Sequence, residues 1–188
     1  TPSFRAYSES IYVYSRLTKY KVGTLDNPSK GEVEGDAAES WEISPDGTQV
    51  TFKIRPNHKF DSRSPTNGRP MDSEDVKWSW QRFISLAPAG ADVAHSRNPA
   101  SPVEELLTPD KRTVVMKLAF PMSSILQMMA HNWYLSILPV EAEDKFDPRR
   151  DMRGSGPWYL SKYATSVGFE YRKNPDWYVP NRPFLEGI

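Results

Sequence analysis

The sequence of 188 residues contains no cysteine. This absence excludes disulfide bridges, cysteine metal ligands and thiol nucleophiles at once. A surplus of one charge is also lacking, because 24 Lys and Arg residues balance 24 Asp and Glu residues. Without a basic surplus the chain has no net attraction for a phosphate backbone, so we expect no nucleic-acid partner.

Long hydrophobic runs are missing as well. The longest lie around Ile125–Met129 and Tyr134–Val140, where polar residues interrupt them. A transmembrane helix needs about 18 consecutive apolar residues, so the sequence predicts none. Because Thr1 is not an initiator methionine, we expect that an N-terminal signal or lipid anchor once preceded it.

Proline and aromatic residues are, in contrast, abundant. Proline accounts for 17 of the 188 residues, about 9%, against an average near 5%. Aromatic residues make up 12% of the chain, which is too high a content for a disordered polymer. The composition predicts a folded domain with many loops.

The spacing of apolar residues predicts a hairpin followed by a helix. Apolar residues at every second position of 48–54 follow a Ser-Pro-Asp-Gly turn sequence, which indicates a hairpin over 41–54. Asp72 is a typical N-cap, and it predicts a helix over 73–86 that stops before Pro88.

Further elements are predicted downstream. The order of strands, helix, strands, helix and strands favours an α+β fold over a doubly wound parallel sheet. The predicted elements are a hairpin with strands 103–107 and 113–118 and a turn at 108–112, a short apolar helix over 124–130, and a strand pair at 158–164 and 169–172.

Two stretches, 61–70 and 88–102, have no regular pattern and are rich in Pro, Gly, Ser or Asn. We expect both to be long surface loops. Loops of this length are more often functional or disordered than accidental.

No motif for catalysis or metal binding emerges. The three histidines, His58, His95 and His131, lie far apart in sequence without metal-ligand spacing. Gly154-Ser155-Gly156 lacks the frame of a nucleophile elbow or a phosphate loop, and we interpret its glycines as backbone freedom at the entry to a strand. We therefore predict no catalytic residue, no metal and no cofactor, in a protein that is not an enzyme.

Four motifs follow one another in a fixed order along residues 35–188. They are GDAAESWEIS at 35–44 with the strand that follows it, GRPMDSEDV at 68–76, GSGPWYL at 154–160 and RKNPDWY at 172–178. This ordered set resembles the family 5 extracellular solute-binding proteins, the receptors of peptide, nickel and oligosaccharide ABC importers.

The resemblance implies a fold and a division of the chain. The fold would be the N-terminal lobe portion of a two-lobe periplasmic binding protein of type II, similar to dipeptide-binding proteins. Residues 1–34 would begin the core of the first lobe, residues 35–156 would form its outer subdomain, and residues 157–188 would return strands to that core. The second lobe would come from the remainder of the chain, which we expect as a partner of this piece.

The resemblance also implies which segments face the ligand cleft. We expect Glu9 or Arg97 to meet a charged end of the ligand. Trp133 and Tyr134 would stack on it, and Asn132 would hydrogen-bond to its backbone amides. The full set of candidate ligand-binding residues is Tyr7, Ser8, Glu9, His95, Arg97, Asn98, Asn132, Trp133 and Tyr134.

The predicted function is the substrate-binding component of an ABC transporter. It would capture extracytoplasmic solutes, above all oligopeptides, for import through permease subunits in the membrane. The resemblance places it in the periplasm or elsewhere outside the cytoplasm, with a lipid anchor as one means of attachment. Two alternatives stay open: a receptor for a non-peptide solute such as a nickel chelate or an oligosaccharide, and a protein-interaction or scaffold domain that uses loops 61–70 and 88–102.

Overall fold

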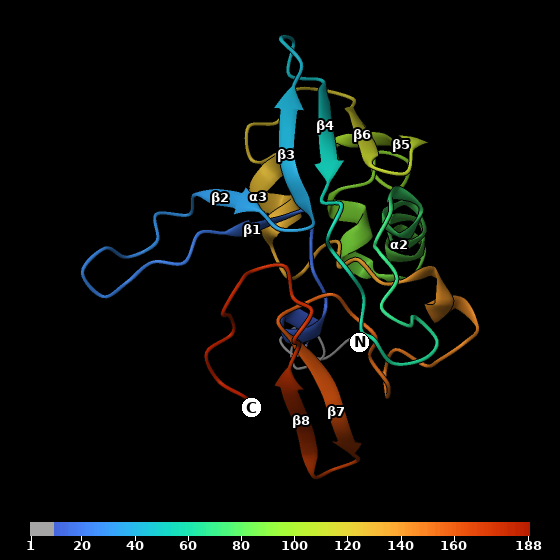
Figure 1. Cartoon of the computed structure of the whole chain (residues 1–188). Helices are drawn as coiled ribbons and strands as arrows, with labels where there is room; N and C mark the ends of the chain where they lie inside the picture. Colours follow the sequence, from blue (N-terminus) through green and yellow to red (C-terminus); the bar gives the residue numbers. More distant parts are fainter. Residues whose placement is uncertain (1–9) are drawn as a thin grey trace.

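The chain begins with a helical turn and a small sheet. The computed structural model describes residues 10–188, of which residues 10–13 are helical. Strand β1 (Thr18–Tyr20) then pairs antiparallel with β2 (Val33–Gly35). The loop between these two strands projects from one side of the molecule (Figure 1). The sheet itself lies against helix α3, since β1 contacts that helix.

A four-stranded antiparallel sheet, ordered β3-β4-β6-β5, dominates one end of the molecule (Figure 1). Strands β3 (Ala38–Ile43) and β4 (Gln49–Ile54) form the predicted first hairpin, which is confirmed. Strand β4 also pairs with β6 (Thr113–Leu118), and β6 pairs with β5 (Val103–Asp110) at the edge. Alternate side chains of β4, Phe52 among them, are fully buried, as the alternating pattern predicts.

Strand β5 is longer than the sequence predicts. It continues beyond Leu107 to Asp110, which pairs with Thr113. The turn therefore contains two residues, and the prediction of a turn over 108–112 was wrong. The register shifts between Leu107 and Asp110, which accommodates Pro109 because proline has no amide hydrogen for the ladder.

Helix α2 (Ser73–Leu86) covers the sheet beside β5 and β6, with the predicted bounds. The Asp72 carboxylate accepts a hydrogen bond from the Glu74 amide at 3.0 Å, and the Asp75 carboxylate accepts one from the Asp72 amide at 3.0 Å. These two bonds form a capping box, which fixes where the helix begins. Trp80 then faces the sheet and is buried.

A buried ion pair fastens the start of α2 to a second part of the chain. The Arg69 guanidinium lies 2.6 Å from carboxylate oxygens of both Asp75 and Glu141. Glu141 belongs to a short 3₁₀ helix, Val140–Glu143, whose first amide also donates to Asp75. Burial raises the pKa of the Asp75 carboxyl, and its bonds with Arg69 oppose that rise.

The largest apolar cluster fills the space between the four-stranded sheet, α2 and helix α3 (Ile125–Ala130). Its buried members run from Leu17 to Ile137, and we call this cluster the first core. Helix α3 is fastened to β1 because the Thr18 hydroxyl donates to the Leu126 carbonyl at 2.8 Å. The predicted apolar helix is thus confirmed, one residue shorter at its start.

A second, smaller cluster lies at the opposite end. Strands β7 (Trp158–Ala164) and β8 (Gly168–Lys173) form a hairpin that points away from the large sheet, confirming the predicted strand pair (Figure 1). The last residues extend it, since the Tyr171 amide donates to the Ile188 carbonyl at 2.8 Å. The buried residues that we call the second core are Val13, Tyr14, Met152, Leu160 and Tyr171.

Two glycines allow the second core to close. A Cβ atom on Gly154 would lie 1.9 Å from the Val13 carbonyl oxygen, and one on Gly156 would lie 2.8 Å from it. Neither glycine has a positive φ. The interpretation of these glycines as backbone freedom is therefore wrong, because close approach of two backbone segments requires them.

The two predicted surface loops are more ordered and more buried than expected. In 61–70, Asp61 is only 4% exposed. In 88–102, the segment Pro88–Asp92 forms a 3₁₀ helix, and Val93 is fully buried in the first core. The sequence did not indicate that Asp61 and Val93 are buried. A proline-rich segment lacks the regular spacing of a helix or strand, but its side chains can still pack in a core.

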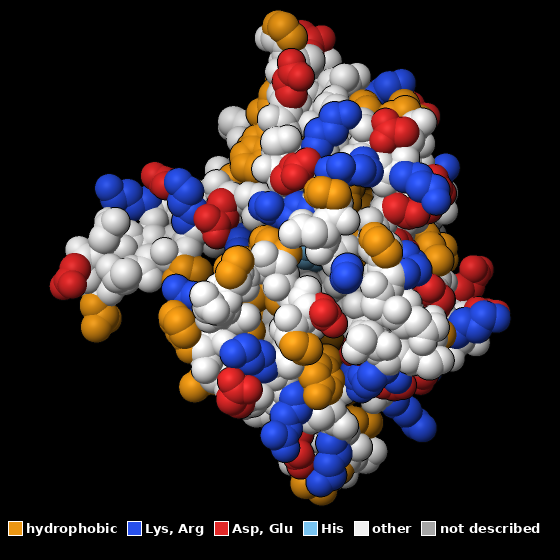
Figure 2. Space-filling model, in the orientation of Figure 1, with side chains coloured by type: hydrophobic (Ala, Val, Ile, Leu, Met, Phe, Trp, Pro, Cys, Tyr) orange, Lys and Arg blue, Asp and Glu red, His pale blue; other side chains and the backbone are white. Residues whose placement is uncertain are grey.

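The surface carries both charges in mixture. On the face that Figure 2 shows, Lys and Arg side chains alternate with Asp and Glu side chains, in line with the formal net charge of zero. Within residues 10–188, no helix has the length and apolar character that crossing a membrane requires.

Candidate functional site

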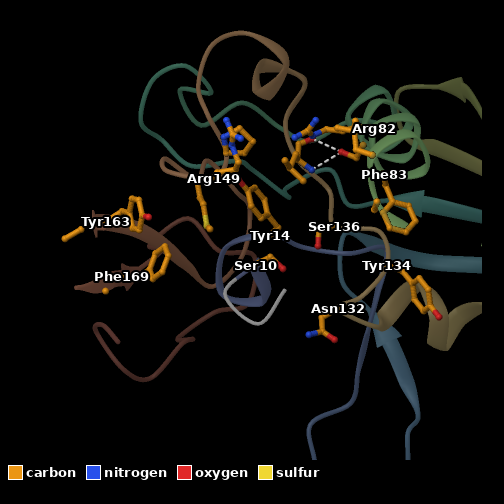
Figure 3. Close-up of a pocket in the computed structure, with 18 of the residues that line it drawn as sticks. Ser10, Tyr14, Arg82, Phe83, Asn132, Tyr134, Ser136, Arg149, Tyr163 and Phe169 are labelled. Atoms are coloured by element: carbon orange, nitrogen blue, oxygen red, sulfur yellow. Dashed lines mark hydrogen bonds between the residues drawn. The ribbon is translucent and has the colours of Figure 1, made fainter. Parts of the chain in front are cut away.

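A hollow of about 620 Å³ lies where the first core meets the second core. The last turns of α2 form one wall through Phe83 and Leu86, and the β7–β8 hairpin forms the other through Tyr163 and Phe169 (Figure 3). Tyr14 lies between the two walls. This volume falls within the range of roughly 300–1,000 Å³ that small-molecule sites occupy.

The segment after α3 completes the hollow and supplies part of its neutral polar groups. Asn132, Tyr134 and Ser136 line it. The Ser79 hydroxyl of α2 holds the segment in place, because it donates to the Leu138 carbonyl at 3.1 Å and accepts from the Leu138 amide at 2.9 Å (Figure 3). The hollow therefore has a fixed wall on the α2 side.

The charged groups of the hollow are all basic among the described residues that line it. Arg82 and Arg149 are the two charged side chains there. Arg149 pairs with the exposed Asp147 at 2.9 Å. Arg82 lies over the ring of Trp78 on its own helix, 5.8 Å from the ring centroid. The positive character of the site thus comes from two side chains in different surroundings.

Two tyrosines of the hollow have perturbed acidities. Burial raises the pKa of the Tyr14 phenol strongly, and the negative charge of Asp151 adds to the rise. The Arg153 backbone amide and the charges of Arg153 and Arg82 oppose it. Burial also raises the pKa of Tyr134, with a contribution from the negative charge of Asp92. Both phenols therefore stay protonated at neutral pH and can donate a hydrogen bond.

The structure brings together part of the predicted binding segment after α3. Asn132 and Tyr134 line the hollow, whereas Trp133 does not. Trp133 is 46% exposed and lies beside the His131 ring, with 6.4 Å between ring centroids. Residues 131–134 form a turn, in which the Tyr134 amide donates to the His131 carbonyl at 3.2 Å, and Trp133 lies on the exposed side of this turn.

The predicted residues before the second hairpin lie away from the hollow. His95, Arg97 and Asn98 are not among its lining residues. Arg97 instead donates to the Ile84 and Ala87 carbonyls at 2.8 and 2.7 Å, at the end of α2. The His95 ring bonds to a carbonyl within its own loop.

The remaining predicted residues, Tyr7, Ser8 and Glu9, lie outside the described residues. Ser10, the first residue that is described, lines the hollow. The expectation for residues 7–9 therefore stays a prediction.

Several lining residues were missed at the level of sequence. Tyr163, Phe169 and Arg82 were assigned to strands and a helix without any site role. One feature of the sequence could have indicated a site role for Arg82. It lies one helical turn before Leu86, an exposed apolar residue at the end of α2. The signal for the hairpin was its aromatic content, with Tyr163 and Phe169 stacked 4.8 Å apart.

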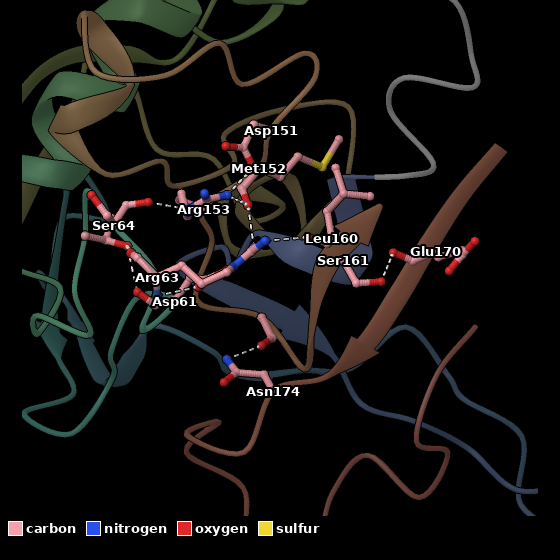
Figure 4. A network of polar contacts seen from close by, with 12 residues as sticks. Asp61, Arg63, Ser64, Asp151, Met152, Arg153, Leu160, Ser161, Glu170 and Asn174 are labelled. Carbon is pink, nitrogen blue, oxygen red and sulfur yellow. Dashed lines mark hydrogen bonds and ion pairs between the residues drawn. The ribbon is translucent and has the colours of Figure 1, made fainter. Parts of the chain in front are cut away.

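Polar contacts fix the second core to the rest of the chain (Figure 4). Arg63 forms an ion pair with Asp61 and donates to the Leu160 carbonyl of β7 at 2.7 Å. Arg153 donates to the Ser64 carbonyl at 2.8 Å. Loop 61–70 thus connects the second core to the rest of the chain through these hydrogen bonds.

A buried histidine lies at the same junction. His58 is 1% exposed, its Nε2 atom lies 3.0 Å from the Ser15 hydroxyl, and its ring lies 4.9 Å from the Tyr178 ring. The Ser15 hydroxyl reaches the Ser155 carbonyl at 3.4 Å. Burial lowers the pKa of His58 to about 4, so the ring is neutral at pH 7. His58 therefore has a structural position, linking three segments.

No metal centre is formed within the described part of the chain. Residues 10–188 contain no group of three or more His, Asp or Glu side chains placed to hold a metal ion.

The structure thus combines a mixed helix and strand fold with a hollow of ligand size between two cores. Residues 32–188 match the bacterial extracellular solute-binding proteins, family 5, and the chain belongs to this family. The family resemblance of the sequence motifs is thereby confirmed.

Named relatives agree with this assignment. The chain is 30% identical over 182 residues to the probable D,D-dipeptide-binding periplasmic protein DdpA of Escherichia coli, which covers 93% of this chain and 32% of that protein. It is 30% identical over 200 residues to di/tripeptide-binding protein 4 of Pseudomonas aeruginosa, covering 97% of this chain and 36% of that protein. The chain thus spans about a third of the length of these relatives.

Solved structures show the same fold. The DppA periplasmic binding protein of Helicobacter pylori, in complex with the peptide STSA, matches 100% of this chain and 38% of its own with a TM-score of 0.81 at 22% identity. AgaA of A. tumefaciens R10, in complex with agropinic acid, matches 99% of this chain and 35% of its own with a TM-score of 0.77 at 26% identity. The α+β fold is therefore that of a portion of a type II periplasmic binding protein, as predicted.

Proposed function

We propose that the protein carrying this chain is the solute-binding component of an ABC importer and that its solutes are short peptides. The observation that carries the proposal is the family match over residues 32–188, joined to a hollow of about 620 Å³ at the junction of two cores. Relatives named for dipeptides and tripeptides support the choice of peptides.

The hollow supplies groups suited to an extended peptide. Asn132 offers both a donor and an acceptor for a backbone amide, and Tyr134 offers an aromatic face. We keep Trp133, His95, Arg97, Asn98, Tyr7, Ser8 and Glu9 as predicted contacts of the solute in the complete binding cleft. Hinge closure of two lobes around the peptide would exclude water from it.

The division of the chain is part of the proposal. Residues 1–34 and 157–188 would belong to the core of the first lobe, and residues 35–156 to its outer subdomain. Membership of the first core from Ala37 to Ile137 and of the second core from Met152 to Tyr171 supports a boundary near residue 150. Leu17 packs in the first core, which supports a junction between the first segment and the outer subdomain near this residue.

The remaining parts of the proposal concern location and partners. The protein would act outside the cytoplasm, free in the periplasm or attached by a lipid anchor, and would deliver its solute to membrane permease subunits. It would bind without chemical conversion. A periplasmic relative named for D,D-dipeptides supports this location.

Calorimetric titration with apolar dipeptides and tripeptides tests the proposal. Val167 lines the hollow and is 84% exposed, whereas Val22 is 91% exposed in a distant loop. We expect Val167→Asp to weaken peptide binding at least tenfold and Val22→Asp to leave it unchanged. Equal affinity in both variants would place the peptide elsewhere, and turnover of the peptide, followed by mass spectrometry, would contradict a pure receptor.

A second candidate solute class is favoured by one specific neighbour. AgaA, a structure at 26% identity, is described in complex with agropinic acid, which is not a peptide. A non-peptide solute receptor would bind such acids, nickel chelates or oligosaccharides and would fail to bind any peptide in the same titration. A protein that bound none of these solutes would instead have an interaction role.

A further inference from the structure

One of the two positive charges of the hollow has no ion-pair partner among the described residues. The described lining of the hollow includes two arginines and neither Asp nor Glu. Arg149 already pairs with Asp147 and is 86% exposed. Arg82 forms neither an ion pair nor a hydrogen bond with any residue of 10–188, and its guanidinium lies over the Trp78 ring at 5.8 Å. Arg82 is therefore the cation available to a ligand.

A hydrogen-bond donor accompanies this cation. The Tyr14 hydroxyl is buried beside the hollow and forms no well-shaped hydrogen bond with residues 10–188. The charge of Arg82 acts on this phenol, lowering its pKa against the effect of burial, so the two groups lie within electrostatic reach. In Figure 3 both lie on the same side of the hollow, opposite Asn132. A cation next to a free hydroxyl suits an oxyanion.

The other wall of the hollow is apolar. Tyr163 and Phe169 stack at 4.8 Å with 24° between ring planes, and Val167 at the hairpin turn is 84% exposed. Phe83 faces them from α2. An occupant must therefore place a negative group near Arg82 and an apolar body against the hairpin.

We propose that the hollow holds the carboxyl-terminal end of the solute, a short peptide whose last residue is apolar. Arg82 pairs with the terminal carboxylate, the Tyr14 hydroxyl donates a hydrogen bond to it, and the last side chain packs against Tyr163 and Phe169. This assignment rests on the proposed function, since it gives the peptide a direction in the site. It adds a charged contact at Arg82 to those that the sequence assigned to Glu9 or Arg97.

Charge-assisted hydrogen bonds are about twice as strong as neutral ones. Replacing the carboxylate by an amide removes the charge and keeps the shape, so the affinity should fall by at least tenfold. Acetylation of the peptide amino group, at the other end, leaves this contact intact.

Calorimetry with the purified protein and three forms of one peptide tests the assignment: Leu-Phe, N-acetyl-Leu-Phe and Leu-Phe amide. We expect the amide to bind at least tenfold more weakly than N-acetyl-Leu-Phe. Arg82→Gln should weaken N-acetyl-Leu-Phe at least tenfold and the amide less than threefold. Arg172→Gln, the matched control at an exposed position of β8 outside the lining of the hollow, should change each affinity less than threefold. Tyr14→Phe, which removes one hydroxyl, should weaken the acid three- to fivefold and the amide by a smaller factor.

The outcomes separate this inference from the proposed function. If acid and amide bind equally, or if Arg82→Gln weakens both equally, the orientation is wrong while peptide binding stands. If the wild-type protein binds none of the three peptides, the peptide function and the orientation both fail. A thermal midpoint of Arg82→Gln close to that of the wild type is required, so that loss of affinity is not loss of fold.

Discussion

The two cores of this chain are held together in different ways. The first core fills the space between a four-stranded sheet and two helices, and Val50, Phe52 and Met116 within it have no exposed surface. The second core is small, and its members Tyr14 and Met152 keep 4% and 7% of their surface exposed. Polar contacts, such as those of Arg63 with the Leu160 carbonyl, fasten it to the rest.

This difference has a consequence for the hollow between them. Burial of apolar area is non-directional and spread over many atoms, whereas a few hydrogen bonds and one close backbone contact can be lost separately. The α2 side of the hollow is therefore the fixed wall, and the β7–β8 side is the wall that yields first. A site that must admit and then enclose a solute benefits from having one rigid wall and one wall that can move.

The largest expected effect comes from opening the first core. Phe52→Ala removes a fully buried ring at the centre of the sheet, and we expect the free energy of unfolding to fall by about 3–5 kcal/mol. Urea denaturation followed by circular dichroism measures it. Leu25→Ala, at a fully exposed site, is the matched control and should stay within about 0.5 kcal/mol of the wild type. A small effect of Phe52→Ala would mean that the first core is not the main source of stability.

A second change is aimed at the second core alone. Gly154→Ala would bring a Cβ atom to 1.9 Å from the Val13 carbonyl oxygen, so backbone must move, at a cost of about 3 kcal/mol. We expect faster hydrogen exchange of β7 and β8 amides, measured by mass spectrometry, with β4 and β6 still protected.

Gly168 offers the control for that experiment. A Cβ atom there would meet no atom within 4 Å, and its φ is not positive. Gly168→Ala should leave exchange unchanged or raise stability by up to about 1 kcal/mol. Loss of protection in the large sheet of Gly154→Ala would show that the two cores unfold as one unit.

The third prediction uses pH at the junction of the cores. Burial lowers the pKa of His58 from 6.5 to about 4, so the unfolded chain binds a proton that the folded chain does not between these values. The contribution of neutral His58 to the free energy of unfolding is thus fully present above pH 6.5 and is lost as the pH falls through 4. One group shifted this far contributes about 3 kcal/mol to the loss.

His58→Gln isolates this contribution. We expect its unfolding free energy, measured by urea denaturation at pH 7 and pH 4, to fall by about 3 kcal/mol less than that of the wild type over this interval. His95→Gln, the same substitution at a histidine outside the junction, is the matched control. An unchanged slope in His58→Gln would show that the ring is not buried as a neutral group.

Local signals allowed much of the fold to be predicted from the sequence. The carboxylate of Asp72 caps α2 at the predicted residue, and the alternation through β4 placed Phe52 in the core. Both depend on neighbours within a few positions, where spacing and capping preferences act directly. The strand pair 158–164 and 169–172 was found for the same reason.

Contacts between segments that lie far apart in the sequence could not be predicted from such local patterns. The approach of Gly154 to the Val13 carbonyl joins parts of the chain that local pattern cannot relate, and so it was misinterpreted as flexibility. Arg82 of α2 and the β7–β8 hairpin line the same hollow although they lie far apart in the sequence. Asn132 and Tyr134 were found through the family resemblance, which carries tertiary information that spacing lacks.

The smallest expected effect concerns Arg97, for which sequence and structure suggest different roles. The guanidinium donates to the Ile84 and Ala87 carbonyls at 2.8 and 2.7 Å, at the end of α2. The Ala87 carbonyl also accepts a hydrogen bond from the Gly90 amide at 3.0 Å. Because the side chain is exposed, we expect Arg97→Ala to lower the free energy of unfolding by about 1 kcal/mol.

Thermal denaturation and peptide titration of Arg97→Ala, taken together, separate the two roles. A helix cap predicts a lower midpoint with the peptide affinity unchanged. A ligand contact predicts the reverse, an unchanged midpoint with weakened binding of the acid form of the peptide. Arg82 and Arg97 lie at the same end of α2, so comparing the two variants also tests which arginine binds the carboxylate of the solute. If Arg97→Ala removes the preference for a carboxylate and Arg82→Gln does not, Arg97 binds the solute, as the sequence analysis predicts.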